Sequence, residues 1–155
     1  MSFQITALSP EEFAPLFDLS DEDLAARLAV RMTATSKPGF PCRVSLADAE
    51  VGEELILVNH QHLAAASPYR ASHAVFIRKG AEQAHPAINE TPRQLTSRAL
   101  SLRAFDGQAM IVAADLIDGA DLAPALNRLL ADPAAAYVHI HFAKHGCCAA
   151  RADRA

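Results

Sequence analysis

The sequence has few of the features that mark membrane proteins, secreted disulfide frameworks or nucleotide-binding enzymes. No apolar run approaches the roughly 20 residues that cross a bilayer, and the first residues, MSFQITALSPEEF, hold no basic stretch followed by an apolar one. Three cysteines, two of them adjacent, do not make the even, spaced set of a disulfide framework, so reduced thiols are expected. The Gly-x-Ser-x-Gly elbow, the Gly-Lys-Ser phosphate loop and the dinucleotide-binding glycine triplet are missing. These absences predict a cytoplasmic location and give no support to nucleotide or serine hydrolysis.

Positive charge is also scarce. Fourteen Lys and Arg residues stand against eighteen Asp and Glu, which leaves a formal net charge of -4. Such a chain repels a polyphosphate backbone unless its basic residues cluster, so neither nucleic acid nor a membrane is expected as a partner. With 155 residues, 51% of them hydrophobic, residues 1–155 are expected to form a single domain with its own core. The oligomeric state stays open.

Helix and strand signals follow one another without strict alternation. Ser9-Pro10-Glu11-Glu12, Ser20 and Thr91-Pro92-Arg93-Gln94 carry helix-start signatures, and Asp118 or Asp121 caps a helix with a leucine stripe at Leu122, Leu126, Leu129 and Leu130. The expected helices cover about 9–17, 20–30, a short stretch after 91, and the leucine-rich segment before Asp132-Pro133. Strands are expected at 32–35, 54–59, 72–78, 99–105 and 109–114, with a stiff loop at 37–43. This order predicts an α+β fold with a mixed or mainly antiparallel sheet, a few short helices and a C-terminal β-hairpin.

The C-terminal segment 136–154 is the most informative part of the chain. Alternation in a strand places Tyr137, His139 and His141 on one face, and Val138, Ile140 and Phe142 on the other. A three-residue loop at 144–146, with Gly146 in the left-handed conformation, sets Ala143 opposite Cys147. In this register Cys147 and Arg151 share the face of the histidines, and Cys148 lies on the core face. The hairpin therefore predicts one apolar face and one reactive face.

Four segments give the chain a resemblance to a known family. They are KPGFPCR at 37–43, SPYRASHAVFIR at 67–78, SLRAFD at 101–106 and HIHFAKHGCCAAR at 139–151. In these segments, and nearly end to end, the chain resembles the bacterial domain-of-unknown-function family 1203. The resemblance implies a small stand-alone bacterial protein and a pattern of His-x-His followed by Gly-Cys, in which His145 and Cys148 are less regular. Because the family carries no assigned activity, the resemblance supplies no mechanism.

The preferred functional hypothesis is a pocket for a small anionic molecule. Guanidinium groups bind carboxylate or phosphate through two parallel hydrogen bonds, and imidazoles can add donors. Tyrosines would supply walls or hydroxyls. The alternative is that the arginines pair with Asp48, Asp106, Asp115 and Asp153 and only fix loops. The expected ligand-binding residues are Arg43, Tyr69, Arg70, His73, Arg103, Tyr137 and Arg151, with His139 and His141 beside them.

A second hypothesis is a metal-dependent enzyme. His139 and His141 lie two apart on one strand face, a spacing by which a strand offers two imidazoles to zinc or iron. A third ligand is expected from His73, with Cys147 and His60 as further options. The alternative is that both histidines only hydrogen-bond to the backbone or to Asp153. A lone His-x-His is a weak signal beside a spaced Cys/His quartet.

Thiol chemistry is the third possibility, with Cys42 or Cys147 as nucleophile and His139 or His141 as acid or base. A neighbouring Arg43 would favour the Cys42 thiolate, whereas a small buried cysteine is the common alternative. Catalysis itself, the reaction and the substrate stay open. A non-catalytic module that acts through edge strands is the remaining class.

Overall fold

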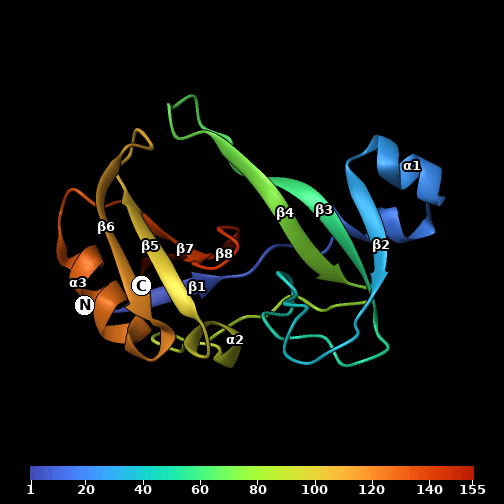
Figure 1. Cartoon of the computed structure of the whole chain (residues 1–155). Helices are drawn as coiled ribbons and strands as arrows, with labels where there is room; N and C mark the ends of the chain where they lie inside the picture. The colour runs from blue at the N-terminus through green and yellow to red at the C-terminus, as the bar shows by residue number, and fades with distance from the viewer.

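The computed structural model describes all 155 residues, which form two antiparallel sheets and a few short helices (Figure 1). One sheet has five strands in the order β1-β8-β7-β5-β6, and the other has three in the order β2-β3-β4. The predicted α+β class and the mainly antiparallel pairing are confirmed. The strands are β1 Phe3–Thr6, β2 Ala29–Thr33, β3 Glu54–Leu63, β4 Ala71–Arg78, β5 Ala99–Phe105, β6 Ile111–Asp118, β7 Tyr137–Phe142 and β8 Cys148–Arg154; the helices are η1 Ala14–Asp18, α1 Asp21–Ala26, α2 Arg93–Thr96, η2 Gly119–Asp121 and α3 Leu122–Ala131.

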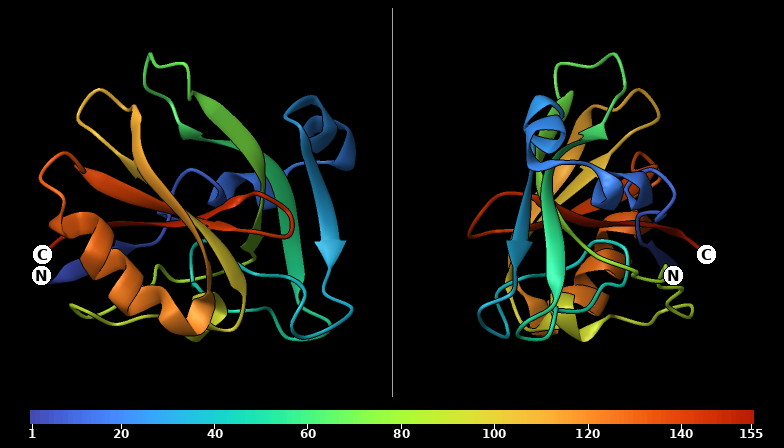
Figure 2. Two further views of the ribbon diagram at one scale, coloured as in Figure 1. Left: turned by 60° about the vertical axis from the view of Figure 1, so that its left-hand side comes forward. Right: turned by 90° about the vertical axis from the view of Figure 1, so that its right-hand side faces the viewer.

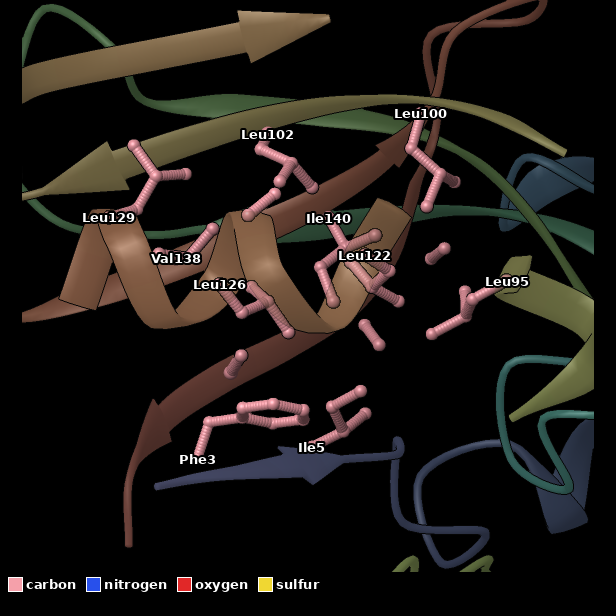
Figure 3. Packing of buried hydrophobic residues seen from close by; sticks show 14 of the residues in the cluster. Phe3, Ile5, Leu95, Leu100, Leu102, Leu122, Leu126, Leu129, Val138 and Ile140 are labelled. Carbon is pink, nitrogen blue, oxygen red and sulfur yellow. The ribbon is translucent and has the colours of Figure 1, made fainter. Parts of the chain in front are cut away.

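The larger hydrophobic core lies between α3 and one face of the five-stranded sheet (Figure 3). Leu122, Leu126 and Leu130 are spaced four apart on α3, so they share one face, and none is exposed. They pack against Val138 and Ile140 of β7 and against apolar side chains of β1 and β5. The predicted leucine stripe of α3 is therefore confirmed, and it leaves the opposite face of the sheet available for polar residues.

The smaller core lies beside the three-stranded sheet, where η1 and α1 pack. The short helix predicted over residues 9–17 is found only in its second half, as the 3₁₀ helix η1, and a turn precedes it. Pro15 explains the difference, because it has no N–H to donate and disfavours the α conformation at Ala14. α1 begins as predicted, with the Ser20 hydroxyl accepting a hydrogen bond from the Asp23 N–H, but it ends at Ala26 and β2 follows earlier than expected.

The two sheets lie next to each other with a space between them. Helix α3 lies on the side of the five-stranded sheet that faces away from the three-stranded sheet (Figure 1, Figure 2). At one end of the contact, Leu63 of β3 packs with Phe105 and Ala109 of the β5–β6 hairpin. The Ser67 hydroxyl in the β3–β4 loop donates a hydrogen bond to the Ala109 carbonyl at 2.7 Å. Both loops therefore close the same end of the space between the sheets. No helix of the chain has the length and the apolar character that crossing a bilayer requires.

The C-terminal hairpin forms as predicted, with one correction near its turn. Val138, His139 and Ile140 pair with Ala152, Arg151 and Ala150, which is the predicted register. Beyond Ile140, His141 pairs with Cys148, so Ala149 is an extra residue in β8. An extra residue reverses the faces of the side chains that follow it. Cys147 therefore lies in the core cluster and Cys148 on the imidazole side, the reverse of the sequence prediction.

Candidate metal centre

Three imidazoles from the two sheets converge in the space between them. His139 and His141 are on β7 of the five-stranded sheet, and His62 is at the end of β3 in the three-stranded sheet. One possible ligand atom from each of the three lies within 4.8 Å of the others. The ring centroids of His62 lie 5.9 Å from His139 and 5.1 Å from His141. The three side chains thus form one cluster, called here the triple-histidine cluster.

Local strand geometry brings His62 into this cluster. β3 extends to Leu63 rather than ending at Asn59 as predicted, and its register with β4 shifts between His60 and Leu63. His60, before the shift, lies against Phe13 in an edge contact with centroids 5.6 Å apart, on the side of the smaller core. His62, after the shift, contacts the imidazoles of the other sheet. The two histidines therefore contact different rings, although both line the small cavity described below.

Each imidazole of the cluster has one buried nitrogen without a hydrogen-bond partner. These atoms are Nδ1 of His62, Nδ1 of His139 and Nε2 of His141. His141 Nδ1 lies 2.9 Å from the Gly146 carbonyl, to which it donates its proton, so Nε2 carries the lone pair. This is the arrangement that orients metal-binding histidines: one nitrogen donates to a carbonyl and the other faces the ion. Buried polar atoms without a partner are uncommon, and an ion is one of the reasons for them.

Burial keeps the three imidazoles neutral. It lowers the pKa of His62 to about 4, and electrostatic repulsion from neighbouring basic groups, Arg103 among them, acts in the same direction. It also lowers the pKa of His139 to about 4 and that of His141 to about 3. No carboxylate is part of the cluster. Because a metal ion binds the neutral form of imidazole, the cluster is in its ligand form at neutral pH.

Aromatic rings surround one side of the cluster. The Phe105 and Tyr137 rings stack 5.3 Å apart, and each contacts the His139 ring, at 5.1 and 5.2 Å. On the other side, a cavity of about 190 Å³ reaches His62 and His139 and is also lined by Thr6, His60 and Cys148. The cluster is therefore covered by aromatic rings on one side and can be reached by a small molecule through the cavity.

The residues predicted to bind an anion do not converge on one pocket. Arg43 and His73 line a second, larger cavity, whereas His139 and Arg151 line the small one. Arg151 lies over the Tyr137 ring at 4.0 Å and donates two hydrogen bonds to Asp153, so its charge is neutralised. Tyr69 and Arg70 are exposed in the β3–β4 loop, and Arg103 lies on β5 opposite His139. His73, the predicted third metal ligand, pairs with His60 across β3 and β4 and lies outside the triple-histidine cluster.

The predicted nucleophiles are not beside the cluster either. Cys42 is fully buried, and its sulfur accepts hydrogen bonds from the N–H groups of Ser45 and Arg78. Cys147 Sγ accepts a hydrogen bond from Arg43 Nη2 at 2.8 Å. Cys148 faces the small cavity, but burial raises the pKa of its thiol to about 12, so it is not a thiolate nucleophile at neutral pH.

Sequence reasoning found His139 and His141 but missed His62. The signal that identifies it is a second His-x-His, formed by His60 and His62 immediately after the apolar run of β3. Two such pairs on separate strands supply imidazoles that meet only when the sheets face each other.

Comparison with known proteins places the chain in a family. Residues 39–154 match the profile of a family described as "Protein of unknown function (DUF1203)". The chain belongs to this family. All three members of the triple-histidine cluster fall within the part that matches DUF1203. No curated protein and no solved structure matches the chain.

The four segments that carry the DUF1203 resemblance contact one another in the fold. An isolated backbone β-bridge pairs Cys42 with Phe76 and joins segments 37–43 and 67–78. Arg103 pairs with His139, which joins segments 101–106 and 139–151. Arg43 connects the first segment to the last, because Nε donates to the Cys148 carbonyl at 2.8 Å. These segments therefore surround the space between the two sheets.

Proposed function

We propose that this protein is a metal-dependent enzyme that holds a Zn²⁺ or Fe²⁺ ion through His62, His139 and His141. The observation that carries the proposal is the convergence of three imidazoles, each with a buried nitrogen that no protein group satisfies. Imidazole is a preferred ligand of both ions. Without an ion, burying three unsatisfied nitrogens in one place costs free energy, about 1–3 kcal/mol for each atom.

The number of ligands favours catalysis over a structural role. Structural zinc sites are closed by four protein ligands, whereas catalytic sites have three and leave a position for water or substrate. Here three imidazoles converge, and the small cavity gives access to His62 and His139. Neutral ligands leave the ion its full charge, so a bound ion would polarise an oxygen atom or lower the pKa of a bound water. The chain's own contribution is to hold the imidazoles and to shield one side of them with Phe105 and Tyr137.

The experiment is metal analysis of protein purified without a histidine tag. After exchange with Zn²⁺, or with Fe²⁺ under anaerobic conditions, and removal of unbound ion, about one equivalent is expected to remain. His62→Ala is expected to reduce the bound metal to background, because His62 is the only ligand from the three-stranded sheet. His73→Ala is the matched control and should retain the metal, since His73 lies outside the cluster. A His62→Ala protein that is folded by circular dichroism and binds as much metal as the wild type would contradict the proposal.

A further inference from the structure

A second cavity, larger than the one beside the triple-histidine cluster, is lined by none of the three imidazoles of that cluster. It has a volume of about 550 Å³, within the usual range for sites that bind small molecules. Its walls come from the loop at 38–43, from the β4 strand and from the turn between β7 and β8. Cys147 lines this cavity and its neighbour Cys148 lines the small one, so the start of β8 lies between the two.

Every charged residue that lines this cavity is basic. Arg43, Arg98 and Lys144 contribute full positive charges, and His73 and His145 add imidazoles. Arg98 is neutralised by Asp48, which accepts hydrogen bonds at 2.6 and 3.2 Å. Lys144 is exposed at the turn between β7 and β8, and it makes no ion pair. Only Arg98 of the three cations therefore has a carboxylate partner.

Arg43 is the most unusual of these cations. Its side chain is 1% exposed, yet all its acceptors are neutral: the carbonyls of Pro41 and Cys148 and the sulfur of Cys147. A guanidinium has five N–H donors, and these three bonds leave two of them without an acceptor. Its Cζ lies 4.7 Å from the centre of the Phe142 ring, on which Arg98 also packs at 5.0 Å. A buried charge without a counter-charge is costly, and a bound anion would supply one.

The walls between the cationic groups are apolar. Leu57, Phe76 and Phe142 line the cavity together with Pro38 and Pro41. Burying the hydrocarbon part of a ligand against such walls favours binding, and a small inorganic ion has no hydrocarbon to bury. The favoured ligand therefore combines an anionic group with an apolar body.

We propose that this cavity binds an organic carboxylate or phosphate monoester, with the anionic group held by Arg43 and Lys144 and the apolar part against Leu57, Phe76 and Phe142. The two N–H donors of Arg43 that have no acceptor belong to Nη1 and Nη2, and a carboxylate or phosphate group offers two oxygens to such a pair. The sequence predicted an anionic ligand but placed five of its seven binding residues elsewhere. Arg98, Lys144 and His145 were not among them.

The test measures binding to the wild-type full chain by isothermal titration calorimetry. The probes are octanoate and phenyl phosphate, and each has a reference partner. The partner of octanoate is 1-octanol, which lacks the charge, and the partner of phenyl phosphate is inorganic phosphate, which lacks the apolar body. At least one of the two organic anions is expected to bind about tenfold more tightly than its partner. If neither binds with a Kd below about 1 mM, or if each partner binds as tightly, the proposal is overturned.

Two variants locate the site. Lys144→Ala is expected to weaken binding about threefold or more and to make it less sensitive to salt, because it removes an exposed charge. Ala99→Phe fills the cavity from its wall and is expected to abolish binding. Lys79→Ala is the matched control, because Lys79 pairs with Glu54 and does not line the cavity. Unchanged affinity in both Lys144→Ala and Ala99→Phe would overturn the assignment.

The same proteins separate this proposal from the metal proposal. Ala99→Phe and Lys144→Ala should keep their metal content, and His62→Ala should keep its affinity for the organic anion. Loss of anion binding in His62→Ala would show that the anion binds at the triple-histidine cluster and not in the large cavity.

Discussion

The imidazoles of the triple-histidine cluster differ from surface histidines in the pH at which they take up protons. In the folded protein, burial lowers the pKa of His62 and His139 to about 4 and that of His141 to about 3. In the unfolded chain they return to the ordinary value of about 6.5. Between these values the unfolded state binds more protons, so the free energy of unfolding decreases as the pH falls from about 6.5 to about 4.

This difference can be measured by urea unfolding of metal-free protein at several pH values between 7 and 4. We expect the free energy of unfolding to fall over that window. At pH 5, unfolding should be accompanied by the uptake of about three protons from solvent, one by each imidazole of the cluster. His62→Ala removes one of the three imidazoles, so its stability should fall less steeply with pH. A wild-type stability that stays constant between pH 6.5 and 4.5 would contradict the burial of neutral imidazoles.

Two of the three members of the triple-histidine cluster could be singled out from the sequence. His139 and His141 share a strand face by alternation alone, which local sequence determines. His62 reaches them across the contact between two sheets, and no local rule predicts which residues meet there. Cys147 and Cys148 were placed on the wrong faces because the extra residue in β8 has no signature in a run of small side chains.

Among the elements, the turn between β7 and β8 positions the site most directly. Gly146 has φ of +82°, and its carbonyl accepts the hydrogen bond from His141 Nδ1. A side chain at this φ is strained by about 1–2 kcal/mol even though the Cβ itself would meet no atom within 4 Å. Gly146→Ala is therefore expected to lower the free energy of unfolding by about that amount and to weaken metal binding through His141.

Gly107→Ala in the β5–β6 turn is the matched control. Its Cβ also meets nothing within 4 Å, and Gly107 is not among the residues with positive φ. Its stability should stay within about 0.5 kcal/mol of the wild type by denaturant unfolding. Equal effects of the two substitutions would show that the left-handed conformation of Gly146 does not matter.

The elements differ in how well the sequence predicts them. β5 and α3 have strong periodicity and clear boundaries, and both lie where expected. β1 was missed because four residues at the amino terminus give too short a pattern. The end of β3 was missed because His60, Gln61 and His62 are polar and resemble a loop, although His60 continues the pairing with β4.

Over the whole molecule, the two largest hydrophobic clusters each pack against one of the two sheets, and the triple-histidine cluster lies where the sheets meet. The expectation of a single domain stays a prediction, and it requires both sheets to unfold together. Far-UV circular dichroism should report both sheets, and near-UV signals should report Tyr69 and Tyr137, which pack on Phe105. Coincident transitions are expected by the two probes, whereas two separated transitions would indicate independent units.

An ion that binds ligands from both sheets should stabilise them jointly. Zn²⁺ at about 100 times its Kd is expected to raise the free energy of unfolding by about 2.7 kcal/mol, because it binds the folded state only. The shift should be the same by both probes and should disappear in His62→Ala. A shift confined to one probe would contradict an ion shared between the sheets.

The triple-histidine cluster is tested most directly by anomalous diffraction from crystals of the metal-loaded protein, recorded at the absorption edge of the metal. The expected result is one strong peak about 2.0–2.1 Å from a nitrogen of each of His62, His139 and His141. A loaded crystal with no peak among these three side chains, or with its peak at His73 or His60 instead, would show that the triple-histidine cluster is not a metal site.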